Sequence, residues 1–382
     1  MEIKELSELL EIRPEQIRQE RKRGTKVIAF FPGNYVPEEI LFAAGTVPIC
    51  LTHGGQGDAV QASRDLVPDI ICPFARAQVG ELVLQTNPFY KEIDMLIAPV
   101  TCQHLKKTAD IWEYRTDMEI FKLGVPPQYD TDFGMDYFVG RLKTMMERVA
   151  SVSGNRLTDE KLVEAIALYN RMRALFRSIS RLRKNNPPIV SFSDFLFLNH
   201  LSFYLDPAVM VAALEKIQHR FERLTQSAES SDKPRILLIG PNVAFGDNTI
   251  SKLVESVNAE IVTEEVCEGI RSYWTDVNTE GDPVRALAEG YLKNKLPCAF
   301  MRKSADRRLD FVDRLIDEFS ISGVLWYELL GCETYDAESY FFAKKMEERE
   351  MPMLVVESDY GPSALQQLVV RMEAFVEQIR GV

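Results

Sequence analysis

Six cysteines are the residues of this 382-residue chain whose type and placement predict chemistry. Two of them, Cys72 and Cys102, lie in the stretch from Val67 to Trp112, where each follows a short apolar run and precedes an amphipathic segment. In α/β proteins this pattern is typical of the carboxyl end of a strand that leads into a helix, where ligands usually bind. A helix N-terminus lowers the pKa of a thiol, and thiolates bind soft metals. We therefore expect both thiols to point at one binding site.

The other cysteines complete a set of three in each half of the chain. They lie close to further apolar runs, at Cys50, Cys267, Cys298 and Cys332. No Cys-x-x-Cys pair exists, which excludes the local motifs of zinc ribbons and ferredoxins, so a metal cluster must be assembled from distant segments. On the residues alone two interpretations stay open, a shared metal site and six unrelated structural cysteines, because free cysteine is also a small buried hydrophobe.

His104 is the one histidine that we single out as a candidate catalytic residue. It lies two residues past Cys102, where it could donate a hydrogen bond to a cluster or a substrate. The glycine-rich loop from Gly54 to Gly57 could bind an anion through its backbone N–H groups, but it matches neither a P-loop nor a dinucleotide fingerprint. A flexible loop or lid is the simpler interpretation of these glycines.

Composition and charge exclude several classes of protein. The net charge of −12 argues against a broad nucleic-acid surface. No apolar run approaches the ~18 residues of a membrane-spanning helix, and the first residues lack the basic and apolar regions of a signal peptide. We expect a cytoplasmic protein whose cysteines are free thiols or metal ligands, because disulfides are rare in that compartment.

Apolar runs alternate with helical patterns in both halves of the chain. This predicts an α/β fold of two doubly wound parallel-sheet domains that face each other across a cleft, with an inserted helical segment. Strands are expected over residues 26–31, 47–51, 235–240, 259–262, 321–327 and 352–357. The predicted division is an N-terminal helix (1–24), a first α/β domain (25–140), a helical segment with linker (141–232) and a second α/β domain (233–382).

Three segments between the predicted strands carry more specific expectations. Residues 113–140 are irregular and aromatic, which indicates a packed connector, and residues 226–234 form a polar linker at the boundary between the domains. A long helix is predicted from Thr158 to about Leu182. Its arginines, among them Arg173 and Arg177, indicate either a solvated face or a docking surface for an acidic partner or a phosphate.

Several blocks resemble the 2-hydroxyacyl-CoA dehydratase and benzoyl-CoA reductase subunit family. They lie in collinear order from about residue 24 to 380, at 24–48, Ala98-Pro-Val-Thr-Cys102, 158–173, 323–332 and Val356-Glu-Ser-Asp-Tyr360. The resemblance implies two doubly wound α/β domains with additional helices. It also implies that Cys72, Cys102 and Cys332, by position, hold one [4Fe–4S] cluster.

Three further cysteines set this chain apart from ordinary members of that family. Cys50, Cys267 and Cys298 make it similar to the branch of double-cubane cluster proteins, in which six thiolates hold an [8Fe–9S] unit of two [4Fe–4S] cubanes joined by a sulfide. The resemblance implies a homodimer that receives electrons from a separate ATP-hydrolysing iron–sulfur reductase. The chain itself has no Walker motif, which is consistent with ATP being hydrolysed elsewhere.

Three functions follow from this resemblance. The first is an ATP-coupled, oxygen-sensitive reductase whose low-potential cluster reduces small, hard-to-reduce molecules. The second is a lyase subunit that dehydrates a 2-hydroxyacyl-CoA through a ketyl radical with one [4Fe–4S] cluster, in which case three cysteines are structural. The third is an electron carrier without a reaction of its own. The sequence predicts no particular physiological substrate.

Overall fold

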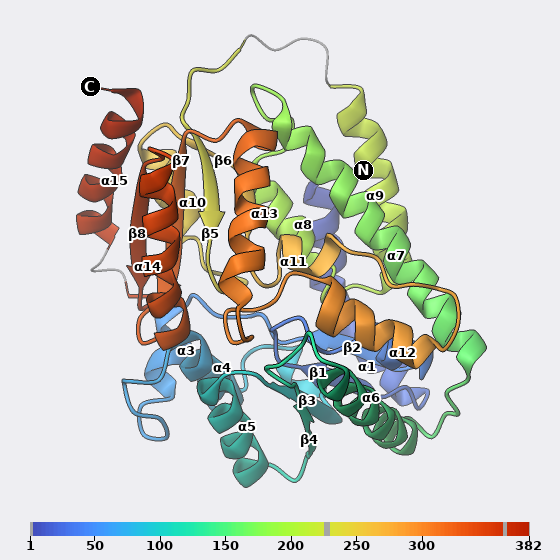
Figure 1. Cartoon of the computed structure of the whole chain (residues 1–382). Coiled ribbons are helices and arrows are strands. Elements are labelled where there is room, and N and C mark those ends of the chain that lie inside the picture. Colours follow the sequence, from blue (N-terminus) through green and yellow to red (C-terminus); the bar gives the residue numbers. More distant parts are fainter. Residues whose placement is uncertain (1–2, 225–229, 362–364, 382) are drawn as a thin grey trace.

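The computed structural model describes residues 3–224, 230–361 and 365–381 of the chain, and they form two four-stranded sheets (Figure 1). All neighbouring strands are parallel, and the strand orders are β2-β1-β3-β4 in the first sheet and β6-β5-β7-β8 in the second. The strands are β1 Val27–Phe30, β2 Val47–Cys50, β3 Met95–Val100, β4 Glu119–Gly124, β5 Arg235–Ile239, β6 Glu260–Glu265, β7 Gly323–Leu329 and β8 Met353–Ser358. The predicted fold class is confirmed.

The two sheets share one topology, which fixes where a ligand can bind. In both, the strand order reverses beside the first strand, between β1 and β3 in one sheet and between β5 and β7 in the other. In open α/β sheets the crevice at such a reversal, outside the carboxyl ends of the strands, is the usual binding site. Figure 1 shows the sheet β1–β4 below the sheet β5–β8.

Helices cover the sheets, because central parallel strands such as β1 and β7 are buried along their whole length. The helices are α1 Ile3–Lys22, α2 Glu38–Ala43, α3 Gly57–Ala62, α4 Pro73–Leu84, α5 Gln103–Arg115, α6 Asp132–Ser153, α7 Asp159–Arg181, α8 Phe192–Leu201, α9 Pro207–Glu222, α10 Thr249–Ser256, α11 Ile270–Tyr273, α12 Pro283–Ala288, α13 Ser304–Phe319, α14 Glu333–Glu348 and α15 Leu365–Arg380, with short turns η1 Tyr90–Glu92, η2 Leu182–Lys184 and η3 Glu289–Asn294. One hydrophobic cluster runs through both halves of the chain.

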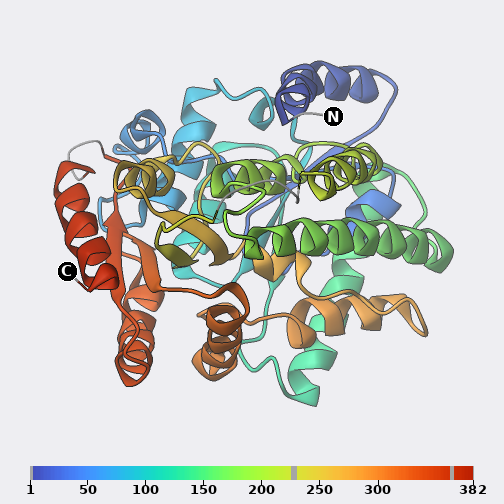
Figure 2. The ribbon, with the colours of Figure 1, turned by 90° about the horizontal axis from the view of Figure 1, so that it is seen from above.

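The predicted long helix is confirmed as α7, whose first turn is capped by the Thr158 side chain accepting from the Lys161 N–H. It lies beside α9, and both helices are visible from above in Figure 2. The expectation of an irregular connector over residues 113–140 is wrong, since β4 and the start of α6 fall there. In β4 only Phe121 and Leu123 are buried. Such a half-buried edge strand has too short an apolar pattern to stand out in the sequence.

The arginines of α7 do not form one surface. Arg173 is buried and donates to Glu39 at 2.5 Å, and Arg177 binds Asp276 at 2.7 Å. Arg183, just past the helix, is fully buried and pairs with Glu264 at 2.5 Å. For Arg173 both interpretations, the solvated face and the docking surface, are therefore wrong, because its charge is buried and paired with Glu39.

The glycine-rich loop packs against the second half of the chain. His53 bridges to Phe245, and a Cβ at Gly55 would lie 2.4 Å from the backbone of Asp247. Gly55 also has a φ of +76°. Gly55 is therefore required for the close approach of two backbones, a reason that the sequence interpretation did not include.

Part of the predicted linker lies outside the described residues, since 225–229 are not among them. The proposed domain boundaries at 24, 140 and 232 stay predictions. Across the described ranges, no helix combines the length and the apolar character that crossing a membrane requires.

Candidate metal centre

A cavity of about 130 Å³ lies where the carboxyl ends of the two sheets meet. That is room for roughly ten water molecules at ~10–15 Å³ each, far more than a packing defect. Most of its wall is apolar, and its lining follows β1, β3, β5, β6 and β7: Pro32, Gly33, Thr101, Cys102, Pro241, Asn242, Cys267, Glu268, Leu329 and Cys332 are among the residues there. The cavity thus joins the two strand-order reversals.

Five of the six predicted ligands line this cavity: Cys72, Cys102, Cys267, Cys298 and Cys332. Distant segments of the chain therefore bring their thiols to one place, and the two outermost, Cys72 and Cys332, are 260 residues apart. All six cysteines are free thiols. The remaining one, Cys50, is the last residue of β2 and is 1% exposed, and it is not among the residues that line the cavity.

Three of the cysteines share one local structure. Cys72, Cys102 and Cys332 are the N-cap residues of α4, α5 and α14. The Leu105 N–H donates to the Cys102 Sγ at 3.3 Å. Cys102 and Cys332 follow strands as predicted, but the strand expected before Cys72 is absent, because residues 67–71 form turns and bends. Pro73 at the first position of α4 starts the helix instead.

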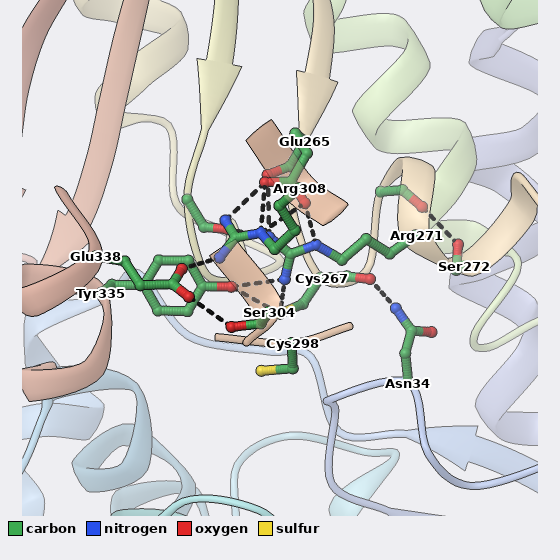
Figure 3. Close-up of polar contacts among 12 residues, drawn as sticks. Asn34, Glu265, Cys267, Arg271, Ser272, Cys298, Ser304, Arg308, Tyr335 and Glu338 are labelled. Atoms are coloured by element: carbon green, nitrogen blue, oxygen red, sulfur yellow. Dashed lines mark hydrogen bonds and ion pairs between the residues drawn. The ribbon is translucent and has the colours of Figure 1, made fainter. Parts of the chain in front are cut away.

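Cys267 and Cys298 form a second group with different surroundings. Their side chains lie close enough for each thiol to shift the pKa of the other. The Arg271 Nη1 donates to the Cys267 Sγ at 3.1 Å, and the Tyr335 Oη lies 3.5 Å from the same sulfur (Figure 3). The Cys298 N–H donates to the Tyr35 Oη at 3.0 Å. Side chains thus contact this pair, with Arg271 and Tyr335 at the Cys267 sulfur and Tyr35 at the Cys298 backbone, whereas the other three cysteines lie at helix N-termini.

Burial controls the protonation of these thiols. It raises the pKa of Cys72 and of Cys102, and it raises the pKa of Cys332 to about 12. Within the pair, the interaction between the two thiols raises the pKa of Cys267 and lowers that of Cys298. The N–H groups of the helix N-termini act to lower the pKa of Cys72 and Cys102, but burial outweighs them, so the expected net lowering is wrong for the metal-free thiols. A metal cation is what can hold such buried sulfurs as thiolates.

His104 also lines the cavity and contacts one of the cysteines. Its Nδ1 accepts a hydrogen bond from the Cys72 N–H at 3.2 Å. The neutral ring therefore carries its proton on Nε2. Burial lowers the pKa of His104, so the neutral form dominates at neutral pH. A role for His104 in catalysis stays a prediction.

Two polar atoms at the cavity have no hydrogen-bond partner within the described part of the protein. They are the Asn242 Nδ2 and the Glu268 Oε2, and both side chains are more than nine-tenths buried. The other carboxylate oxygen of Glu268 accepts from the Gly33 N–H at 2.7 Å. Leaving such groups unpaired costs about 1–3 kcal/mol each, so a bound group that contacts them is expected.

The geometry suits a polynuclear cluster better than a single ion. No three His, Cys, Asp or Glu side chains of the described ranges gather closely enough to hold one metal ion. A zinc site needs four ligands converging on one ion at about 2.3 Å for sulfur. The thiolates of an iron–sulfur cluster bind separate irons and so need not converge. Five cysteines around an apolar cavity, with N–H donors to sulfur and two unpaired polar groups, fit a cluster.

Sequence reasoning missed Arg271, Tyr335, Asn242 and Glu268. Glu268 and Arg271 are one and four residues past Cys267, and Tyr335 is three past Cys332. Proximity to a predicted ligand was the available signal. It was too weak to use, because many polar residues lie equally near a cysteine.

Comparison of the sequence with known proteins finds relatives that match over most of the chain. Residues 34–379 match the family described as "2-hydroxyglutaryl-CoA dehydratase, D-component". The chain is 25% identical to "Putative dehydratase subunit YjiM" of Escherichia coli (strain K12), over 94% of this chain and 93% of that protein. It is 24% identical to a benzoyl-CoA reductase subunit of Thauera aromatica (95% and 93%) and 22% identical to "(R)-phenyllactyl-CoA dehydratase beta subunit" of Clostridium sporogenes (93% and 92%).

Proposed function

The chain belongs to the 2-hydroxyglutaryl-CoA dehydratase D-component family, and we propose that within it this protein is an ATP-coupled reductase component that carries a double-cubane [8Fe–9S] cluster. The observation that carries this proposal is the gathering of Cys72, Cys102, Cys267, Cys298 and Cys332 around one cavity. A single cubane held by three thiolates leaves Cys267 and Cys298 without a purpose in a mostly apolar wall. Cys50 is the proposed sixth ligand.

The two kinds of surroundings support a division of the ligands. Cys72, Cys102 and Cys332, at three helix N-termini, would hold one cubane. Cys267 and Cys298, which line the same cavity and lie beside Arg271 and Tyr35, would hold the other together with Cys50. When bound, such a cluster supplies electrons at low potential, since its net negative charge and burial oppose further reduction.

The chain's own residues provide the environment for that chemistry. The mostly apolar wall offers water few hydrogen-bond partners, which favours a substrate over water beside the cluster. The Asn242 Nδ2 offers an unused donor, and the His104 Nε2 carries a proton at the edge of the cavity. These groups can orient a small molecule beside the cluster. A small substrate suits a cavity of about 130 Å³ that a cluster must share, and a low-potential cluster suits a substrate that is hard to reduce.

The proposal includes two partners. The sequence has no Walker motif, so the electrons would come from a separate ATP-hydrolysing iron–sulfur reductase. A homodimer is proposed as the assembly. Relatives named as subunits, such as the benzoyl-CoA reductase and phenyllactyl-CoA dehydratase proteins, support the view that this chain acts with partner proteins.

Metal analysis tests the proposal directly. Protein expressed with ample iron and purified without oxygen should be brown and contain about eight irons per chain. Addition of the ATP-hydrolysing reductase, ATP and a small reducible molecule should then give turnover. Colourless, iron-free protein would refute the proposal, and iron without turnover of any tested small molecule would favour an electron carrier.

A second candidate is a 2-hydroxyacyl-CoA dehydratase subunit with one [4Fe–4S] cluster. The observation that favours it is that Cys72, Cys102 and Cys332 alone share the N-cap position, while relatives are named as dehydratase subunits. About four irons per chain, together with loss of water from a 2-hydroxyacyl-CoA, would select this function instead.

A further inference from the structure

Arg271 is a buried cation held between a carboxylate and a cysteine. It is 3% exposed, and its Nε pairs with the Glu265 carboxylate. Its Nη1 points the other way and donates to the Cys267 Sγ at 3.1 Å and to the Tyr335 Oη at 2.6 Å (Figure 3). The carboxylate therefore compensates one end of the guanidinium, while the other end presents its N–H groups to sulfur.

The surrounding network fixes this orientation. Glu265 also binds Arg308, whose Nη2 lies 2.7 Å from the second carboxylate oxygen. Arg308 in turn pairs with Glu338, which accepts from the Ser304 hydroxyl at 2.7 Å. Two guanidinium groups therefore share the Glu265 carboxylate, and Arg271 stays anchored to it.

From this contact we infer that Arg271 is a positioning residue, which holds the Cys267 sulfur and raises the reduction potential of the half of the cluster bound by Cys267 and Cys298. This inference rests on the proposed cluster. A cation beside a ligand sulfur stabilises the added negative charge of the reduced state, and hydrogen bonds to the sulfurs act in the same direction. Within the described ranges, the Cys102 Sγ accepts from the neutral Leu105 N–H, and the sulfurs of Cys72 and Cys332 accept no cap hydrogen bond from their helices. The two halves should therefore differ in potential.

Tyr335 links the two halves. Its hydroxyl contacts Arg271 and Cys267, while its backbone N–H donates to the backbone carbonyl of Cys332 at 3.0 Å. Removal of the hydroxyl takes away no charge. A Tyr335→Phe variant should accordingly lower the potential less than loss of Arg271 does.

The test is a reductive titration of the anaerobically purified holoprotein. A low-potential chemical reductant supplies one electron to the cluster, which is followed by its electron paramagnetic resonance signal, and no protein bond is made or broken. Arg271→Gln should lower the midpoint potential of the first reduction by about 59 mV or more. For one electron this corresponds to a tenfold change in the reduction equilibrium constant. Arg271→Lys keeps the charge and should stay near the parent protein. Glu265 keeps Arg308 as partner in both variants, which favours folding.

Arg183→Gln is the matched control. Arg183 is also buried and pairs at 2.5 Å with Glu264, the residue before Glu265 in the chain. Its other side-chain contacts are Ser180 and the Phe195 ring, and none of these partners is a cysteine. It should leave the midpoint unchanged. An unchanged midpoint in Arg271→Gln with full iron overturns the inference, as does an equal shift in Arg183→Gln. Iron lost in Arg271→Gln but kept in Arg271→Lys supports the holding role, and iron lost in both overturns it. Iron-free parent protein instead refutes the proposed function itself.

Discussion

Cys50 is the residue at which the six-thiolate proposal can be tested most sharply. It is buried at the end of β2, and the five other cysteines line the cavity while it does not. If Cys50 binds iron, Cys50→Ala and Cys50→Ser should each lower the iron content from about eight to about four per chain. The four irons that remain should be those assigned to Cys72, Cys102 and Cys332.

A purely structural Cys50 leads to different magnitudes. Cys50→Ala would then remove one buried heavy atom and cost about 1 kcal/mol, close to the loss of a methylene group. Cys50→Ser would bury a hydroxyl and cost about 1–3 kcal/mol if that hydroxyl finds no partner. Iron and acid-labile sulfide would be unchanged in both variants, and only the denaturation midpoint would move.

The assay therefore combines two measurements on the same anaerobic samples, iron per chain and the free energy of unfolding by denaturant. Cys298→Ser serves as the reference for a cavity-lining ligand. Eight irons in Cys50→Ala, beside about four in Cys298→Ser, would refute the six-thiolate ligand set while keeping the cluster site.

The remaining predictions concern the ligand division, the glycine-rich loop from Gly54 to Gly57 and a buried histidine. Cys102→Ser should remove the half of the cluster that Cys298→Ser leaves in place, so the two variants should give different electron paramagnetic resonance spectra; identical spectra would contradict the division. Gly55→Ala should destabilise the protein by about 2–4 kcal/mol, because backbone strain adds to overlap with the loop after β5. The control Gly154→Ala, at a φ of +70° with open space around it, should cost only about 1 kcal/mol. Equal free-energy costs in the two variants would rule out the overlap. Burial lowers the pKa of His200 to about 4, so below pH ~6.5 the unfolded chain binds more protons than the folded one, and stability should fall as the pH drops towards 4. At pH 5 this amounts to about 2 kcal/mol, and His200→Gln should remove that part of the pH dependence in denaturant titrations at pH 5 and 7; an unchanged slope would show that His200 does not titrate in this range.

The strands and most helices could be predicted because central parallel strands are continuous apolar runs. β1, β5 and β7 are buried along their whole length, so their sequences stand out from their surroundings. The edge strand β4 escapes such a pattern because only alternate residues are buried there. The sequence of the turns before Cys72 has the apolar pattern of a strand, because it includes Ile70 and Ile71. Ile70 is nevertheless 73% exposed, so this pattern does not reflect a buried strand.

The candidate site was predictable to the extent that its residues follow strands. Cys102, Cys267 and Cys332 come after β3, β6 and β7, and parallel strands deliver their carboxyl ends to one edge. Cys298 follows no strand and reaches the cavity through packing between η3 and α13. The contact of Arg271 with Cys267 depends on the network of Glu265 and Arg308, which only the three-dimensional arrangement reveals.

The cavity belongs to neither sheet alone, and this links cluster binding to the packing of the two halves. The Gly33 N–H after β1 donates to Glu268 after β6, and the side chain of Asn34 donates to the carbonyl of Cys267. These contacts fix the first sheet against the loop that carries Cys267. Arg271 and Tyr335 hold the same cysteine from the other side. Because Cys267 is held by both halves before any metal is considered, the pair Cys267–Cys298 is preorganised for a ligand, and a shift of one sheet against the other would change its geometry first.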